Sequence, residues 1–161
     1  MLGVGRVTPL KGYDVLLRAT ALARARLPTV KTVIVGGAEP GREGTLLELR
    51  RLADELGLGG HVAFAGSRGQ VAEVYACGDV LVSGNRSKPE AFGRSMAEAL
   101  AMGCPVIATR FGGALDIVRE GVDGWLVEPG DAAALADRLV EASRTRLSGL
   151  RAGALARFSL D

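Results

Sequence analysis

The stretch that decides the fold is PEAFGRSMAEALAMGCPVIAT, residues 89–109. A polar loop leads into a Phe-Gly turn, a helix of small residues follows, and a Gly-Cys-Pro triplet separates this helix from an apolar strand. The stretch also carries two carboxylates, Glu90 and Glu98, with seven residues between them. Because an ionised carboxylate accepts hydrogen bonds from two hydroxyl groups at once, this unit suits a polyhydroxylated ligand at the mouth of an α/β sheet.

The rest of the chain repeats the alternation of strand and helix. Strands are predicted at 2–7, 31–35, 61–65, 80–83, 105–108 and 125–127, and helices at 11–27, 45–56, 71–76, 95–102, 114–119, 132–140 and 147–157. Continuous apolar strands between amphipathic helices indicate an α/β fold with a parallel sheet covered on both faces. We therefore expect one doubly wound, Rossmann-like domain over residues 1–161, with its ligand site at the carboxyl ends of the strands.

Bulk composition excludes several classes of function. A net charge of +2 and an aromatic content of 4% argue against nucleic acid as a partner. The two cysteines, Cys77 and Cys104, lie in apolar segments and are expected to be buried, reduced thiols of a cytoplasmic protein. Met1–Val7 does not read as a signal peptide, and no apolar run approaches the ~20 residues that span a bilayer.

Two cations flank the first predicted strand–helix junction. Arg6 follows the strand, and Lys11 stands where the helix is expected to begin. The free N–H groups and dipole of a helix N-terminus favour anions, and Arg and Lys add positive charge, so a diphosphate would fit here. The alternative is a solvated Arg and Lys in a loop. The segment has neither the G-x-G-x-x-G pattern of dinucleotide-binding folds nor a P-loop.

The two carboxylates of the opening stretch are placed to act on either side of such a phosphate. The turn at Gly93 lets the backbone approach a ligand closely, and the helix that follows it presents N–H groups to phosphate. Glu90 would then hold sugar hydroxyls on one side, and Glu98 would hold ribose hydroxyls on the other. The alternative is an ordinary loop glutamate and an ordinary surface glutamate on a helix.

Several segments together resemble one enzyme family. The opening stretch, followed by Gly112-Gly113, is similar to the donor-site signature of retaining glycosyltransferases with the GT-B fold, in the glycogen-synthase-like and mannosyltransferase-like group. The supporting segments are VGRVTPLKGYDVLLRA (4–19), IVGGAEP (34–40), HVAFAGSRGQVAEVYACGDVLVS (61–83) and GVDGWLVEPGD (121–131). The resemblance covers nearly the whole chain and implies the C-terminal, donor-binding domain of such an enzyme.

The resemblance also implies what the site does. In the complete enzyme, a hexosyl group would move from a UDP-, GDP- or ADP-linked sugar to an acceptor hydroxyl, without a metal or other cofactor. The set expected to act on the diphosphate and the sugar is Arg6, Lys11 and Glu90. The set expected to bind the rest of the donor is Phe92, Gly93, Arg94, Glu98, Gly66, Ser67 and Arg68. In this second set Glu98 would bind the ribose, and residues 66–68 would lie near the base.

Some features depart from the family pattern. Asp116 stands where the family often has a glutamate after its Gly-Gly pair, and Lys88 adds a cation beside the signature. The N-terminal acceptor domain is not part of this chain, so a non-catalytic nucleotide-sugar-binding or regulatory module, or half of a GT-B-like epimerase, are alternatives. No lysine stands in a setting that suggests the pyridoxal phosphate of a phosphorylase.

The C-terminal region carries a run of basic residues. These arginines are Arg138, Arg144, Arg146, Arg151 and Arg157. A basic amphipathic segment can rest on an anionic membrane, so a peripheral membrane location is one interpretation. A solvated basic face, or a surface that docks the acceptor domain, is the other.

Overall fold

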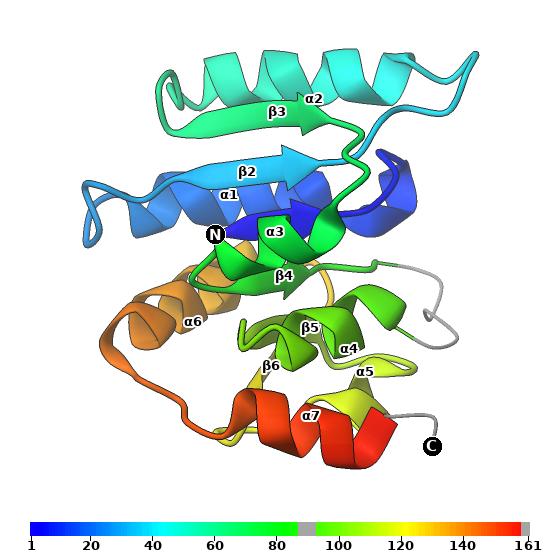
Figure 1. Cartoon of the computed structure of the whole chain (residues 1–161). Helices are drawn as coiled ribbons and strands as arrows, with labels where there is room; N and C mark the ends of the chain where they lie inside the picture. The colour runs from blue at the N-terminus through cyan, green and yellow to red at the C-terminus, as the bar shows by residue number, and fades with distance from the viewer. Residues whose placement is uncertain (87–92, 159–161) are drawn as a thin grey trace.

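A computed structural model describes residues 1–86 and 93–158 and is built around one six-stranded sheet (Figure 1). The strands are β1 (Leu2–Val4), β2 (Thr32–Val35), β3 (Val62–Gly66), β4 (Leu81–Ser83), β5 (Val106–Thr109) and β6 (Gly124–Val127). All neighbouring strands are parallel, in the order β3-β2-β1-β4-β5-β6. This is the strand order of a Rossmann fold, so the expected doubly wound sheet is confirmed.

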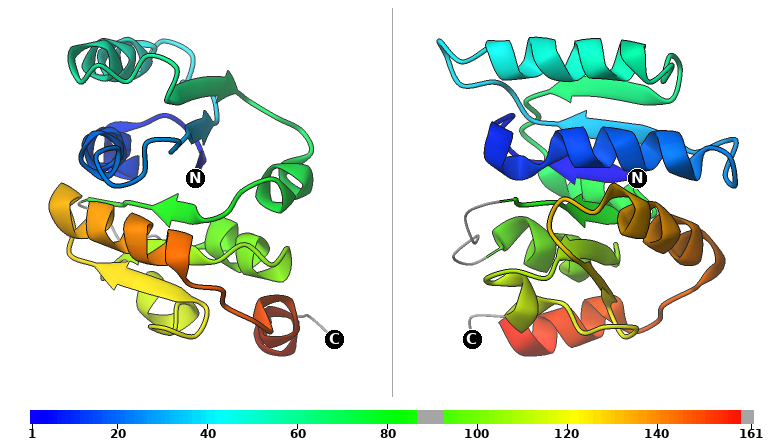
Figure 2. Two further views of the ribbon diagram at one scale, coloured as in Figure 1. Left: turned by 90° about the vertical axis from the view of Figure 1, so that its left-hand side faces the viewer. Right: turned by 180° about the vertical axis from the view of Figure 1, so that it is seen from behind.

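Helices cover both faces of the sheet. They are α1 (Tyr13–Ala23), α2 (Gly44–Glu55), α3 (Val71–Ala76), α4 (Arg94–Ala101), α5 (Ala114–Ile117), α6 (Ala132–Arg144) and α7 (Leu150–Phe158), with a short 3-10 turn, η1, at Pro9–Lys11. Figure 2 shows α1, α2 and α6 on one side of the sheet and α3, α4 and α7 on the other. This two-sided cover explains why the strands are apolar throughout rather than alternating.

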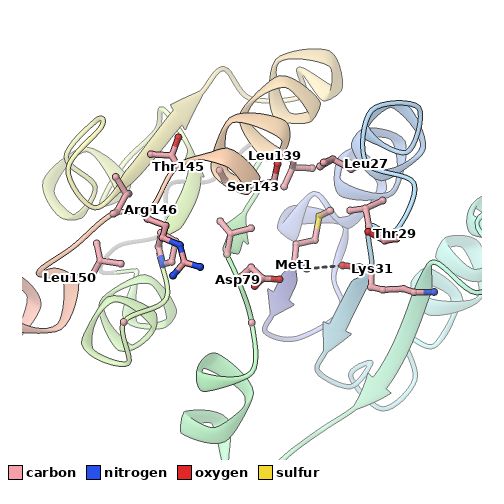
Figure 3. Close-up of a pocket in the computed structure, with 17 residues that line it drawn as sticks. Met1, Leu27, Thr29, Lys31, Asp79, Leu139, Ser143, Thr145, Arg146 and Leu150 are labelled. Carbon is pink, nitrogen blue, oxygen red and sulfur yellow. Dashed lines mark hydrogen bonds between the residues drawn. The ribbon is translucent and has the colours of Figure 1, made fainter.

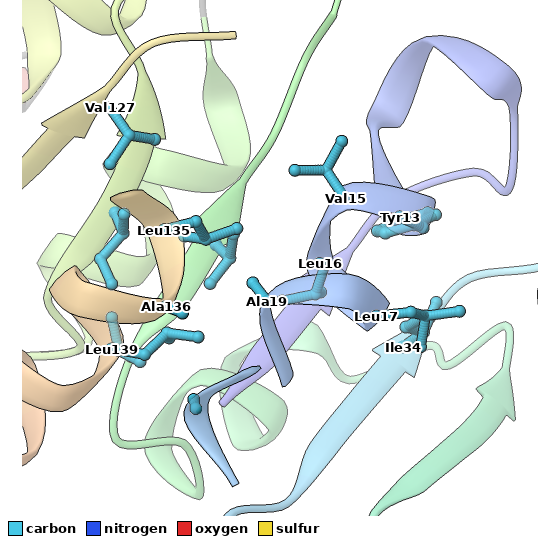
Figure 4. Close-up of a cluster of buried hydrophobic side chains, with 14 of the residues drawn as sticks. Tyr13, Val15, Leu16, Leu17, Ala19, Ile34, Val127, Leu135, Ala136 and Leu139 are labelled. Carbon is cyan, nitrogen blue, oxygen red and sulfur yellow. The ribbon is translucent and has the colours of Figure 1, made fainter. Parts of the chain in front are cut away.

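Each face of the sheet has its own core. On one side Leu16 and Leu17 of α1 pack with Ile34 of β2 and Leu135 of α6 (Figure 4). On the other side Met96 and Leu100 of α4 pack with Tyr75, Leu81 and other side chains, all of them buried. The apolar periodicity of the sequence therefore marks real core faces. The helices are held mainly by burial of these stripes, since a helix of about 10 residues is marginal alone.

Most helix ends differ from the predicted ones by a few residues, and one of the shifts has a clear cause in backbone geometry. Asp131 caps α6 by accepting a hydrogen bond from the N–H of Ala134 at 2.8 Å, as its position predicts. The first helix was expected over 11–27 but spans Tyr13–Ala23. Gly12 has φ +64°, a left-handed conformation that an α-helix cannot contain, and it separates η1 from α1. Lys11 therefore ends a 3-10 turn instead of starting the α-helix.

The two cysteines differ in environment. Both are free thiols. Cys104 is buried as expected, and burial raises its pKa to about 11. The expectation for Cys77 was wrong, because this residue is exposed. It is the C-cap residue of α3 and lies one residue beyond the end of that short helix. Within the described residues, no helix is long and apolar enough to cross a membrane.

Candidate functional site

The strand order reverses between β1 and β4, and the loops that leave these two strands meet there. The chain runs from β1 to α1 on one face of the sheet and from β4 towards α4 on the other. A Cβ added to Gly12 would overlap the carbonyl oxygen of Gly84, so the two loops are in direct backbone contact. Ligands of doubly wound sheets bind in the crevice at such a switch point. The residues predicted from the sequence can be placed relative to it.

Lys11 lies at the switch point. Its Cε and Nζ are 3.4 and 3.7 Å from the position that a Cβ on Gly5 would occupy. The Tyr13 hydroxyl is also close to Gly5 and donates a hydrogen bond to its carbonyl oxygen at 3.0 Å. Gly5 has φ +138°, so a side chain at this position would be strained. The structure thus brings an ammonium and a hydroxyl to the backbone where β1 ends.

Arg6 lies beside Lys11 in the chain but has a carboxylate partner. Its guanidinium is paired with Glu39, which lies in the loop between β2 and α2. Arg42 also approaches Glu39, at 3.6 Å. The Arg6 side chain is 76% exposed, so it extends into the open region above the sheet. Sequence reasoning missed Glu39, because an isolated acidic residue in a Gly/Pro loop carries no pattern of its own.

Residues 66–68 lie two strands away from the switch point. The carbonyl of Gly66 accepts a hydrogen bond from the N–H of Gly36 at 2.9 Å, across the ends of β3 and β2. The Ser67 Oγ would be only 2.7 Å from a Cβ on Gly37, so that glycine makes room for the serine. Arg68 is exposed. Backbone hydrogen bonds of Gly36 and Gly37 link this loop to the β1 loop, because the Val7 N–H donates to the Gly37 carbonyl oxygen at 2.9 Å.

On the other side of the switch point, α4 begins as predicted. Gly93 is its N-cap residue, with φ +32°, and Arg94 is its first, exposed residue. A Cβ on Gly93 would overlap Met96 Cε and lie 2.9 Å from Ile117 Cδ1. A side chain at Gly93 would therefore require Met96 and Ile117 to shift, in addition to adopting a left-handed conformation, and the sequence does not reveal these contacts.

Glu98 lies on the second turn of α4 and has a neighbour on α3. The Tyr75 hydroxyl donates a hydrogen bond to Glu98 Oε2 at 3.2 Å. Burial, and then the nearby negative charge of Glu98, raise the pKa of Tyr75 above its usual value. The phenol therefore stays protonated and can keep donating. Tyr75 is a second residue that sequence reasoning missed, since its apolar setting suggests only core packing.

Several predicted residues cannot be placed in this site. Glu90 and Phe92, and also Lys88, lie outside the described residues. Asp116 lies in the first turn of α5 with an exposed side chain. Its backbone carbonyl accepts a hydrogen bond from Arg157 at 2.7 Å, which connects it to α7. Among the described residues, no group of three or more His, Cys, Asp or Glu side chains could hold a metal ion.

The predicted residues do not line the larger cavities. A cavity of about 700 Å³ lies at the opposite, amino edge of the sheet, with Met1, Asp79 and Arg146 on its wall (Figure 3). A smaller one, of about 310 Å³, lies between α1 and α2 and reaches Arg86. The predicted residues instead share the open carboxyl edge, so they and the larger cavity lie at opposite ends of the sheet.

Comparison with known proteins identifies the family. A model of the family "Glycosyl transferases group 1" matches residues 1–152. The chain belongs to this family. The D-inositol 3-phosphate glycosyltransferase of Mycolicibacterium smegmatis is 41% identical over 140 residues, which cover 86% of this chain and 31% of that protein. The enzyme of the same name from Thermomonospora curvata is 38% identical, over 96% of this chain and 37% of that protein.

Solved structures of GT-B glycosyltransferases share the fold of this family member. Anabaena Alr3699/HepE, solved in complex with UDP and glucose, is 33% identical, with a TM-score of 0.87 over 98% of this chain and 44% of that chain. The C-terminal domain of a glycosyl transferase group 1 family protein, LpcC from Francisella tularensis, is 25% identical, with a TM-score of 0.85 over 99% of this chain and 86% of that one. The chain spans about a third of the length of the curated relatives above.

Proposed function

We propose that this chain is the donor-binding domain of a retaining glycosyltransferase. In the complete enzyme, a hexosyl group would pass from a nucleoside-diphosphate sugar to an acceptor hydroxyl with retention at the anomeric carbon. The observation that carries the proposal is the meeting of the Lys11 loop with the β4 loop at the switch point, in a member of this family. A 33% identical neighbour solved with UDP and glucose supports the ligand class.

The diphosphate would lie between the β1 loop and α4. Lys11 and Arg6 supply positive charge from one side, and the first N–H groups of α4 supply donors from the other. As the sugar leaves, negative charge grows on the diphosphate, and fixed donors of this kind stabilise it without reorganising. The Arg6 guanidinium has five N–H donors, so it can keep Glu39 and still reach a phosphate oxygen. No metal is required in this proposal.

The residues proposed to bind the ribose, the base and the sugar are assigned relative to the same diphosphate position. Glu98, with Tyr75 holding one of its oxygens, would accept hydrogen bonds from the ribose hydroxyls. Residues 66–68 lie at the end of β3, the outermost strand on this side of the sheet, and would face the base. Glu90, with the backbone of Phe92, Gly93 and Arg94, would bind the sugar, as the family signature implies.

The acceptor site would belong to an N-terminal domain outside this chain, so residues 1–161 would bind the donor but lack a complete active site. Two of the basic residues near the C-terminus have internal partners: Arg138 pairs with Glu120 at 2.8 Å, and Arg157 with Asp123 at 3.1 Å. Arg144, Arg146 and Arg151 are exposed. A cytoplasmic enzyme that touches an anionic membrane through these three arginines is part of the proposal.

Calorimetry on the chain tests this function directly. UDP, GDP and ADP are titrated into the folded protein, and one of them is expected to bind with a dissociation constant below the millimolar range. Glu98→Ala should weaken that binding, whereas Glu48→Ala, on the exposed face of α2, should not. If none of the three nucleotides binds folded protein at millimolar concentration, the proposal is wrong. An unchanged affinity of Glu98→Ala would reject the ribose role alone.

A further inference from the structure

An ion pair joins the β4 loop to the first turn of α1. Arg86 Nη1 lies 2.7 Å from Asp14 Oδ2, although the two residues are 72 positions apart in the chain. The Arg86 N–H also donates to the Leu10 carbonyl at 3.1 Å. Together with the contact between Gly12 and Gly84, this makes three links between the same two loops. The β4 loop is thus fastened to the segment that carries Lys11.

This ion pair is poorly suited to a role in global stability. The Arg86 and Asp14 side chains are 47% and 28% exposed, and pairs of this kind typically stabilise a fold by only about 0–1 kcal/mol. What such a pair can fix is geometry, since a guanidinium and a carboxylate have defined directions of approach. Here it fixes the two loops that leave the sheet on opposite sides of the switch point.

We propose that Asp14 and Arg86 are positioning residues of the donor site. By holding residues 84–86 of the β4 loop on the Lys11 loop, the pair sets the position of the Lys11 ammonium relative to the carboxyl end of β4. The inference rests on the proposed function, because it concerns the same diphosphate. Neither residue needs to touch the donor for this effect.

The direction in which one substitution changes the affinity distinguishes this role from simple electrostatics. Asp14→Asn removes a negative charge close to the expected diphosphate site and leaves Arg86 without its partner carboxylate. If only charge mattered, or if Arg86 bound the phosphate itself, the affinity for an anion would rise. If the pair positions the loops, the affinity falls although a repulsive charge has been removed.

The experiment is calorimetry with whichever of UDP, GDP and ADP binds most tightly, and NMR titration with the corresponding nucleoside. We expect Asp14→Asn and Arg86→Gln each to weaken nucleoside diphosphate binding by about 3- to 10-fold, a size usual for coupled contacts. Binding of the nucleoside should not change. The reversed pair, Asp14→Arg with Arg86→Asp, should recover part of the loss.

The chain offers a matched control. Arg26 pairs with Asp137 at 2.7 Å, beyond the far end of α1 from the switch point. Asp137→Asn makes the same change of charge and should leave binding unchanged. Thermal unfolding is recorded for every variant. If Asp14→Asn does not fold, Asp14→Glu replaces it. The expected loss of affinity is then smaller, because glutamate keeps the charge but shifts its position.

The outcomes are distinguishable. Wild-type protein that binds no nucleotide contradicts the proposed function. Wild-type binding with unchanged or tighter binding by the folded Asp14 variant contradicts only the positioning role. Equal loss for the nucleoside and the diphosphate would also contradict it, because a general weakening of the fold affects both ligands alike.

Discussion

Both the carboxyl and the amino edge of the sheet are rich in glycine, but Gly12 and Gly36 at the carboxyl edge serve a different purpose from Gly60 and Gly103 at the amino edge. At the carboxyl edge a Cβ on Gly12, Gly36 or Gly93 would overlap backbone or side-chain atoms. At the amino edge Gly60 and Gly103 also have positive φ, yet nothing lies within 4 Å of their added Cβ atoms. Gly60 and Gly103 only let the chain reverse direction. Gly12 and Gly36 instead let two loops pack against each other, because an added Cβ would overlap backbone atoms of the neighbouring loop.

The two edges also differ in shape. The amino edge holds the larger cavity, whereas the carboxyl edge is open. Exposed cations occur at both edges, with Arg6, Arg68 and Arg94 at the carboxyl edge and Lys31 and Arg146 at the amino edge.

The addition of one methyl group at each edge is expected to have the largest effect. Gly12→Ala should lower the free energy of unfolding by more than about 3 kcal/mol, because the new Cβ overlaps the Gly84 carbonyl in a left-handed conformation. Gly103→Ala should cost about 1–2 kcal/mol, since only the conformational penalty applies. Urea denaturation of both variants measures the difference. Equal losses would show that the two edges are not packed differently.

Removal of one lysine from each edge tests whether the position of a positive charge matters. Lys11→Ala should weaken nucleoside diphosphate binding by about 10- to 100-fold, the usual loss for one charge-assisted hydrogen bond. Lys31→Ala, at the amino edge, removes an ammonium that donates to the Gly60 carbonyl and should leave binding unchanged. Calorimetry at two salt concentrations checks both. A similar loss for the two variants would mean that only net charge matters.

The smallest expected effect concerns the contact between Tyr75 and Glu98. Tyr75→Phe should weaken nucleotide binding by about 2- to 5-fold, because Glu98 loses the donor that orients it. The pKa of Tyr75 is raised in the folded protein. The contribution of this tyrosine to the free energy of unfolding is therefore fully present below the ordinary tyrosine pKa, and it is lost as the pH rises above that value. Wild-type unfolding free energy should therefore fall above about pH 10, and less so in the variant. Identical pH profiles would contradict this.

Much of the fold could be predicted from local sequence patterns. The helix at Val71–Ala76 has the predicted bounds, and the other predicted strands and helices are all present, each with at least one end shifted. The shift at α1 has a local cause, the left-handed Gly12, but a glycine inside an otherwise periodic segment does not announce its φ. Cys77 shows a similar limit, because hydrophobic neighbours say little about a residue at the last turn of a short helix.

Candidate residues of the site could also be predicted, but their partners could not. Lys11 and Glu98 stand out because they follow expected strand ends or helix starts. Glu39, Tyr75 and Asp14 do not, because each partner comes from another element: Glu39 contacts Arg6, Tyr75 contacts Glu98, and Asp14 contacts Arg86. No spacing rule connects positions that are brought together only when strands order themselves as β3-β2-β1-β4.

The sequence by itself determined the class of this protein: alternating apolar strands and amphipathic helices, and a signature that places it among glycosyltransferases. Those properties are local, since each depends on residues within one turn, one strand or one motif. Only the tertiary structure decided that the Lys11 loop and the β4 loop touch, and that Asp14 and Arg86 hold them together. The physical reason is that the distance between two loops depends on how the whole sheet packs, which no single segment encodes.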